Sequence, residues 1–186
     1  MKKIFVLMAV ITASFCAMAQ EPLSYTEVIQ QQGKSSSEIY KQVKKWFAVT
    51  FKSAQDVIQY DGAGEEITGK AAIVYDEKSM TWAAASGLIY YNVEVKVKDG
   101  RFKFTMDNFI HKSTHPTWGE KWSNGLVYKN LPSDDELKAI GYGGLAKKQY
   151  KAIDKRIRPL CFKEIAGLVA SIKAYMEKQQ QEDDNW

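Results

Sequence analysis

The middle of the chain alternates between apolar and polar residues with the period of two that is typical of a β-strand with one buried face. The apolar positions of the clearest such segment are Ile89, Tyr91, Val93, Val95 and Val97. After Asp99-Gly100, a dipeptide favoured in two-residue hairpin turns, the alternation resumes at Phe102, Phe104 and Met106. This turn pairs Lys98 with Arg101, Val97 with Phe102, Val95 with Phe104 and Val93 with Met106. Turn and pattern therefore predict the same register.

Three more strands are predicted at residues 23–31, 57–60 and 66–75. Helical spacing indicates an amphipathic helix over about residues 36–50, which begins at the capping box formed by Ser35 and Glu38. A second helical pattern runs over residues 145–178 and contains Pro159. Proline removes a backbone donor, so we expect it either to kink this helix or to divide it in two.

The resulting order is one strand, one helix, four strands and one helix. An antiparallel sheet with helices on one face buries both kinds of apolar stripe, which predicts an α+β two-layer fold. Residues 20–178 would form this single domain. Residues 111–144 are predicted as an irregular insert with one short capped helix near Ser133, and residues 179–186 as a polar tail that frays.

Some segments resemble a known family. They are the stretch from Ile39-Tyr40 to Trp46-Phe47, residues 51–59, and residues 98–102. Together with the order of elements, they are similar to Bacteroidetes domains of unknown function with a TATA-binding-protein-like (TBP-like) fold. The similarity covers residues 23–109. It implies a secreted or envelope protein with no established activity and no catalytic residues to carry over, and the 111–144 insert looks longer than the family's connection.

The first residues have the order of a secretory signal peptide. Lys2 and Lys3 precede an apolar run, and Ala17-Met18-Ala19 follows it. The residues before Cys16 do not fit lipid attachment, so we expect cleavage after Ala19 and a periplasmic or extracellular location. The apolar run is too short to remain as a membrane span. The exported chain would keep Cys161 as its single cysteine, on an apolar helical face where a buried, inert thiol is expected.

Composition narrows the class of protein further. The chain has 186 residues, of which 45% are hydrophobic and 26% charged, which excludes collagen-like and wholly disordered proteins. Loss of Lys2 and Lys3 lowers the formal charge from +4 to +2, too little to indicate nucleic acid. The solvent face of the hairpin carries Lys96, Lys98, Arg101 and Lys103, which we interpret as protection against sheet-to-sheet aggregation.

Candidate chemistry is sparse. His111 and His115 have a spacing that would suit zinc on a helix, but they follow a strand and precede Pro116, so we interpret them as a solvated strand end. The Gly141–Gly144 loop matches no phosphate-binding motif and is interpreted as a tight turn. Asp134, Asp135 and Glu136 are interpreted as the acidic first turn of a capped helix. No cofactor, metal or catalytic residue is predicted.

Two groups of residues are candidates for binding. Lys147, Lys151, Lys155 and Arg158 form a basic stripe on the last helix, offset in sequence by Asp154 alone. The stripe could contact an anionic envelope surface or be a solvated helix face. Trp118, Trp122 and Tyr128 lie in the insert and could anchor a partner or sugar, or pin the insert to the domain.

The sequence thus predicts a non-enzymatic envelope protein that binds an unknown ligand or partner through the aromatic insert, without nucleic acid. The alternative is an envelope hydrolase or metal-dependent enzyme that uses His111 or His115 with an unidentified carboxylate.

Overall fold

The computed structural model describes residues 20–51, 53, 57–62 and 64–183; the predicted signal segment, residues 1–19, lies outside them. The strands are β1 (Tyr25–Gln30), β2 (Ile58–Asp61), β3 (Glu66–Tyr75), β4 (Gly87–Lys98), β5 (Arg101–Ser113) and β6 (Gly125–Leu126). The helices are α1 (Ser36–Thr50), the 3₁₀ helix η1 (Met80–Ala85), α3 (Gly119–Trp122), α4 (Asp134–Ala139) and α5 (Gly144–Asp183).

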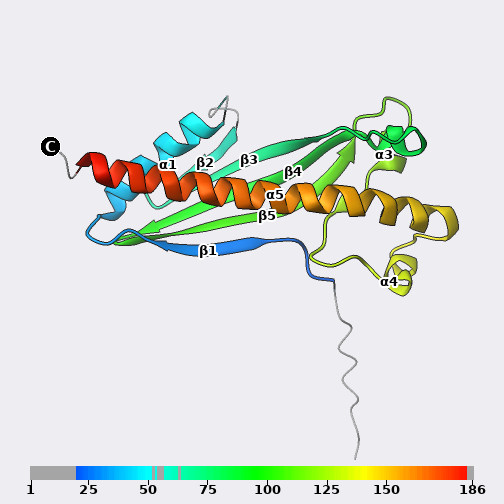
Figure 1. Ribbon diagram of the computed structural model, residues 1–186. Coiled ribbons are helices and arrows are strands. Elements are labelled where there is room, and N and C mark those ends of the chain that lie inside the picture. The colour runs from blue at the N-terminus through cyan, green and yellow to red at the C-terminus, as the bar shows by residue number, and fades with distance from the viewer. Residues whose placement is uncertain (1–19, 52, 54–56, 63, 184–186) are drawn as a thin grey trace, which may run out of the picture.

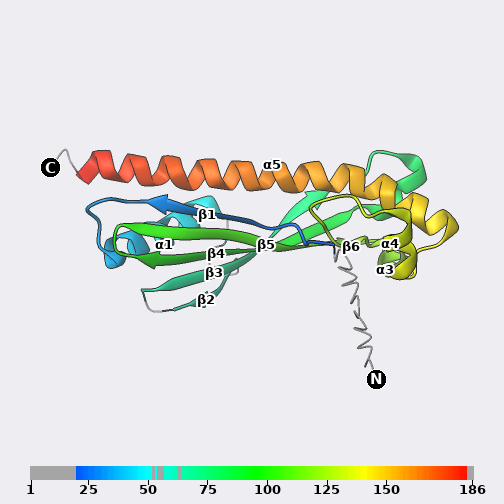
Figure 2. The same ribbon diagram turned by 90° about the horizontal axis from the view of Figure 1, so that it is seen from below.

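The strands form one six-stranded antiparallel sheet in the order β1-β5-β4-β3-β2, and β6 pairs with β5 at the end where β5 stops. Helix α5 lies along the length of the sheet. Helix α1 packs against both α5 and the sheet, near the C-terminal end of α5 (Figures 1 and 2). The predicted α+β two-layer architecture and the predicted order of its principal elements are confirmed.

The β4–β5 hairpin has the predicted register. Val97 lies opposite Phe102, Val95 opposite Phe104 and Val93 opposite Met106, and Lys98 pairs with Arg101 across the turn. Gly100 occupies the left-handed region with φ of +72°, but Asp99 does not have a positive φ, so the turn differs from the type I′ turn that Asp-Gly favours. Local turn chemistry and burial of one face therefore act together here.

The prediction that an irregular insert begins at His111 is wrong, because β5 continues to Ser113. A bulge shifts the register: Asn92 pairs with Asp107 but Tyr90 pairs with Ile110. Within the bulge, Asn108 has a φ of +55°. The extra residue moves the inward positions from even to odd numbers, so that Phe109 and His111 face the core.

The remainder of the insert is also more regular than predicted. Val127, just after β6, accepts a hydrogen bond from Leu23 N–H at 2.8 Å and donates one to the Phe109 carbonyl, also at 2.8 Å. The insert thereby bridges β5 and the chain that leads into β1. The predicted short helix is confirmed as α4, and Ser133 and Glu136 form its capping box.

The core lies between the sheet and the two long helices. Trp46 of α1 is fully buried, packs edge-on against Phe47, Phe51 and Phe104, and donates from its indole N–H to Ser171 Oγ on α5 at 3.1 Å. The capping box predicted at Ser35 and Glu38 starts α1, whose bounds match the prediction. Burial of this helical face holds both layers together.

Helix α5 is a single helix of 40 residues with Pro159 inside it. Pro159 does not divide it, and Figures 1 and 2 both show one continuous rod. Because Pro159 lies on the exposed side, the carbonyl that loses its helical donor faces water. The predicted frayed tail is wrong as far as residue 183, because the helix continues to Asp183. No helix in the described part of the chain is long and apolar enough to cross a membrane.

Candidate functional site

Trp122, one of the predicted binding residues, anchors the insert. It is partly buried against the hydrophobic core and packs edge-on against Trp82 of η1, with ring centroids 5.9 Å apart. Ser113 N–H donates to Ser123 Oγ at 2.9 Å, and Ser113 Oγ donates to the Ala84 carbonyl at 2.6 Å. These contacts join α3 to both β5 and η1, which gives Trp122 the structural role that the sequence left open.

Trp118, by contrast, is 53% exposed and is the N-cap residue that precedes α3. The N–H groups of Thr117 and Trp118 donate to His115 Nδ1 at 3.3 and 3.1 Å, so the histidine closes a tight turn beneath the tryptophan. The Lys121 ammonium lies 5.5 Å from the centroid of the Trp118 ring. An aromatic face with an adjacent cation is thus presented to solvent on a fixed turn.

Tyr128 does not join the two tryptophans. Its backbone bridges to Pro22, and its side chain is half-buried near Tyr142 and Tyr150, which pack edge-on with centroids 5.0 Å apart. In Figure 1, α3 and α4 lie on opposite sides of α5 at the same end of the sheet. The structure therefore splits the predicted aromatic group into an exposed residue, a partly buried residue packed against the core and a member of a tyrosine cluster.

His111 is fully buried, so its interpretation as part of a solvated strand end is wrong. Its Nε2 donates to the Ala85 carbonyl at 3.0 Å, and its Nδ1 accepts from Asn124 N–H at 3.0 Å. Burial holds the pKa of the imidazole below its ordinary value of 6.5, against the opposing effect of the Ala85 carbonyl. Both ring nitrogens serve backbone groups, which makes His111 a structural linker between η1, β5 and the start of β6.

A buried carboxylate that the sequence did not single out bonds to Tyr75, whose ring packs edge-on against His111. Glu77 is 7% exposed, bonds to the Tyr75 hydroxyl, accepts from Ser79 N–H at 2.7 Å, and lies 3.4 Å from Arg156 Nε. Burial alone would raise the pKa of this carboxyl, but these hydrogen bonds and the arginine outweigh it and hold the pKa low. The group joins the β3–η1 corner to α5; no sequence motif marks it, because its partners are far apart in the chain.

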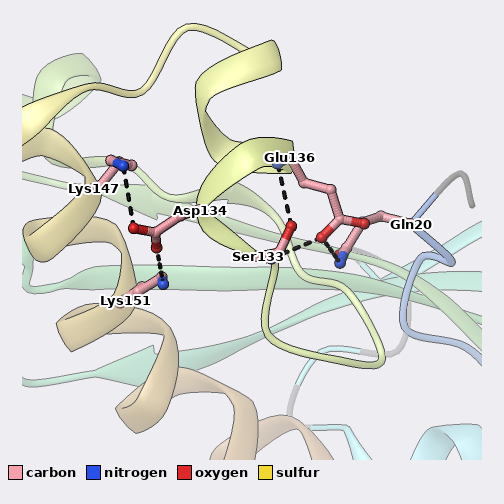
Figure 3. Close-up of polar contacts among 6 residues, drawn as sticks. All are labelled: Gln20, Ser133, Asp134, Glu136, Lys147 and Lys151. Carbon is pink, nitrogen blue, oxygen red and sulfur yellow. Dashed lines mark hydrogen bonds and ion pairs between the residues drawn. The ribbon is translucent and has the colours of Figure 1, made fainter.

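Three of the four cations of the basic stripe pair with carboxylates within the protein. Lys147 and Lys151 both pair with Asp134 of α4, as Figure 3 shows. Arg158 pairs with the buried Asp154 one turn away. The sequence-based statement that Asp154 alone offsets the stripe is therefore wrong, because folding brings Asp134 alongside it.

These ion pairs attach α4 to α5. Hydrogen bonds from Lys151 and Lys147 lower the pKa of Asp134 below its ordinary range. Glu136, the capping residue, also accepts from Gln20 Nε2 at 3.0 Å (Figure 3). Lys155, the remaining lysine of the stripe, is exposed. Among the described residues, no group of three or more His, Cys, Asp or Glu side chains could hold a metal ion.

A family model matches the part of the chain that runs from β1 into β5. Residues 25–112 match the family model described as a domain of unknown function, DUF4468, with TBP-like fold. These residues form a DUF4468 domain. No curated protein matches the chain. The DUF4468 match ends within β5, so α3, α4 and α5 lie beyond it.

Two solved structures are similar to the chain. A TBP-like protein from Parabacteroides distasonis has 11% sequence identity and a TM-score of 0.49, with 84% of this chain and 93% of that chain covered. A DUF4468 family protein from Bacteroides ovatus has 17% identity and a TM-score of 0.41, with 81% and 86% covered.

Proposed function

We propose that this protein is an exported, non-enzymatic binding protein that contacts its ligand or partner through Trp118. The observation that carries the proposal is the contrast between the two tryptophans of the insert. Trp122 fixes α3 to the core, whereas Trp118 stays 53% exposed on the turn that α3 supports. A rigid, exposed aromatic residue loses little conformational entropy on binding and is typical of interaction hot spots.

The charge beside Trp118 adds to this support. Lys121 lies over the ring, and its carbonyl accepts from Gln149 Nε2 at 3.1 Å, which ties the turn to α5. A partner that covers Trp118 would therefore meet an aromatic face, an ammonium group and few side chains that must be immobilised. Binding is favoured over the hydrolase alternative because His111 uses both ring nitrogens inside the core and His115 Nδ1 already accepts from the N–H groups of Thr117 and Trp118.

Site-specific photocrosslinking in the native host tests the proposal. A crosslinking amino acid replaces Trp118 in one strain and Leu145 in another. Leu145 is the matched control because it is more exposed, at 82%, and lies in the first turn of α5 at the same end of the sheet. We expect a discrete adduct of defined mass from position 118 and none from position 145. Equal adducts from both positions, or none from either, would contradict the proposal.

Export is tested separately. We expect the purified native protein to begin at Gln20 and to fractionate with the periplasm or the cell surface, as the signal-peptide pattern of residues 1–19 predicts. Mass spectrometry of the intact chain measures the cleavage. A full-length chain recovered from the cytosol would refute export while leaving the crosslinking result to be judged by itself.

A further inference from the structure

A hollow with only cationic and apolar lining lies at the end of the sheet where β4 turns into β5. It has a volume of about 320 Å³ and is lined by Val28, Lys96, Lys98, Arg101, Phe102 and Lys103. We call it the hairpin hollow. Figure 1 places the β4–β5 turn at the opposite end of the sheet from α3, so the hollow is separate from the surface around Trp118.

Most of this positive charge has no counter-charge. Lys96 pairs with Glu94 at 3.0 Å and with Glu66 at 3.6 Å. Within the described part of the chain, no ion pair compensates Lys98, Arg101 or Lys103, and all three side chains are exposed. Three uncompensated cations therefore remain around the hollow.

The carboxylate nearest to these cations in the sequence, that of Asp99, bonds to helix α1. Asp99 Oδ1, in the turn itself, accepts from Ser36 N–H at 2.7 Å, at the start of α1. Hydrogen bonds from Ser36 lower the pKa of Asp99. Its charge is thus directed to the α1 N-terminus, where it offsets the helix dipole, rather than to the lysines and the arginine beside it.

The register forces these cations together. Lys98 lies directly opposite Arg101, and Lys96 directly opposite Lys103. Like charges that face each other across antiparallel strands are destabilising, and residues two apart on one strand project from the same face. The turn and the buried partners of β4 and β5 hold this arrangement in place, so the repulsion cannot relax by a register shift.

We propose that the hairpin hollow binds a ligand through a phosphate group or a pair of adjacent phosphate groups. A phosphate ester carries a charge of about −1.5 to −2 near pH 7 and three acceptor oxygens, so one such group can satisfy several convergent cations. The Arg101 guanidinium can form the paired hydrogen bonds that suit phosphate, while Lys98 and Lys103 act as flexible point charges. Val28, which is 49% exposed on the adjacent strand, offers an apolar contact to the rest of the ligand.

Titration with inorganic pyrophosphate at an ionic strength of about 0.15 M, where charges are screened over about 8 Å, tests the site, with protein expressed from the full-length sequence. Binding is followed by calorimetry and by the shifts of backbone amides. We expect saturable binding that shifts the amides around Gly100. The double variant Lys98→Gln/Arg101→Gln should bind at least about tenfold more weakly, because each charged hydrogen bond contributes on that scale.

The matched control is Lys148→Gln/Lys155→Gln, which removes the same charge from exposed positions on α5. It should change the pyrophosphate affinity by less than about twofold, since surface charges at a distance are screened. Equal weakening in both double variants would overturn the proposal, because net charge alone would then account for binding. Amide shifts centred on α5 instead of the hairpin would overturn it as well.

A second arm identifies the source of the phosphate. Vesicles of neutral lipid, with and without phosphatidic acid, are sedimented with the wild type and both double variants. Pyrophosphate binding without vesicle binding assigns the hollow to a soluble phosphate ligand. Vesicle binding that requires phosphatidic acid and is lost in Lys98→Gln/Arg101→Gln assigns it to a lipid headgroup. Failure of both probes overturns the proposal, and it leaves the crosslinking test of Trp118 unaffected.

Discussion

The environment of His111 is decided by a residue three positions earlier in the chain, Asn108. The bulge at Asn108 turns the following side chains over, so that a histidine which pattern alone would place near solvent enters the core. There it packs edge-on against Tyr75 and bonds to two backbone groups. A titratable side chain is thereby kept neutral as part of the structure.

The stability of the protein should fall as the pH falls through the range in which His111 titrates. The pKa of His111 is lowered in the folded state, so its contribution is fully present above the ordinary value of 6.5 and is lost as the pH drops from there toward the folded pKa. Urea unfolding at pH 7.5 and pH 5 measures this. We expect His111→Gln to lose about 1–3 kcal/mol at pH 7.5 and to show a smaller pH dependence.

His115→Gln is the control for this experiment, because it removes the other histidine and keeps His111. Its free energy of unfolding should retain the pH dependence of the wild type. An unchanged pH dependence in His111→Gln would mean that carboxyl groups alone cause the acid destabilisation, contrary to the expectation.

Asn108 itself should respond to substitution according to backbone preference. It is exposed and has a φ of +55°, where glycine is unstrained and β-branched residues are not. Asn108→Gly should leave the free energy of unfolding nearly unchanged, whereas Asn108→Val should lower it by about 1–3 kcal/mol. Thermal or urea unfolding distinguishes the two, and equal effects would show that the bulge does not depend on this φ.

Helix α5 determines the shape of the molecule at the scale of elements. With 40 residues it is far longer than the usual helix of about 11–12 residues, and it contacts β3, β5, η1, α1 and α4. Its packed face, which includes Ile153, Ile157 and Cys161, spans the position of Pro159 without interruption. Tertiary packing thus maintains helical geometry where the local sequence opposes it.

Replacement of Pro159 by alanine should stabilise the protein. Alanine restores a backbone N–H to the helix and removes a ring that opposes it, effects worth up to about 3 kcal/mol, while the more flexible unfolded chain offsets up to about 1 kcal/mol. We therefore expect urea unfolding to show a rise of about 1–3 kcal/mol in the free energy of unfolding.

Lys163→Ala serves as the control for this substitution. Lys163 is exposed and lies four residues after Pro159, on the same side of α5. Lysine and alanine are both good helix formers, so this change should alter the free energy of unfolding by less than about 0.5 kcal/mol. A loss of stability in Pro159→Ala would indicate that the proline shapes the packing of α5.

Some features of the helices and strands follow from the local sequence, and others do not. The bounds of α1 and the register of β4 with β5 follow from capping, turn and periodicity signals that are all local. The continuity of α5 through Pro159, and the extension of β5 past the bulge, depend on contacts with distant residues. Local rules predicted a kink or break in the helix and an end to the strand, and packing overrode them.

At the scale of the whole molecule, the sheet carries different surfaces at its two ends. The insert end presents Trp118, and the hairpin end presents the uncompensated cations of the hairpin hollow. Between these two ends, large buried side chains such as Trp46 and Tyr91 fill the space between the sheet and helices α1 and α5. The two surfaces can therefore be changed independently of the core.

Cys161 reports on the opening of that core. It is fully buried, and burial raises the pKa of its thiol to about 12. In the native protein we expect labelling by a thiol reagent only through global unfolding, so the labelling rate should rise steeply with urea. In the fully unfolded protein the thiol should react at the rate of a free cysteine. Rapid labelling without denaturant would show that α5 separates from the sheet locally.

The candidate sites were only partly accessible from sequence. Trp118, Trp122 and Tyr128 were recognised as aromatic residues of one insert, but the separate environments of Trp122 and Tyr128 arise from contacts with η1 and with the chain before β1. The sequence indicated Asp154 as the single carboxylate that offsets the basic stripe, because Asp134 lies outside the helical pattern and reaches Lys147 and Lys151 only through the fold. The Glu77 cluster has no local pattern at all.

The sequence by itself determined where the sheet turns, which faces of its strands are apolar and where α1 begins, because these depend on interactions between near neighbours. Only the tertiary structure decided which charges are neutralised, which tryptophan is exposed and how a histidine becomes buried. Those outcomes depend on pairs of residues far apart in the chain, and no periodicity in the sequence records such pairs.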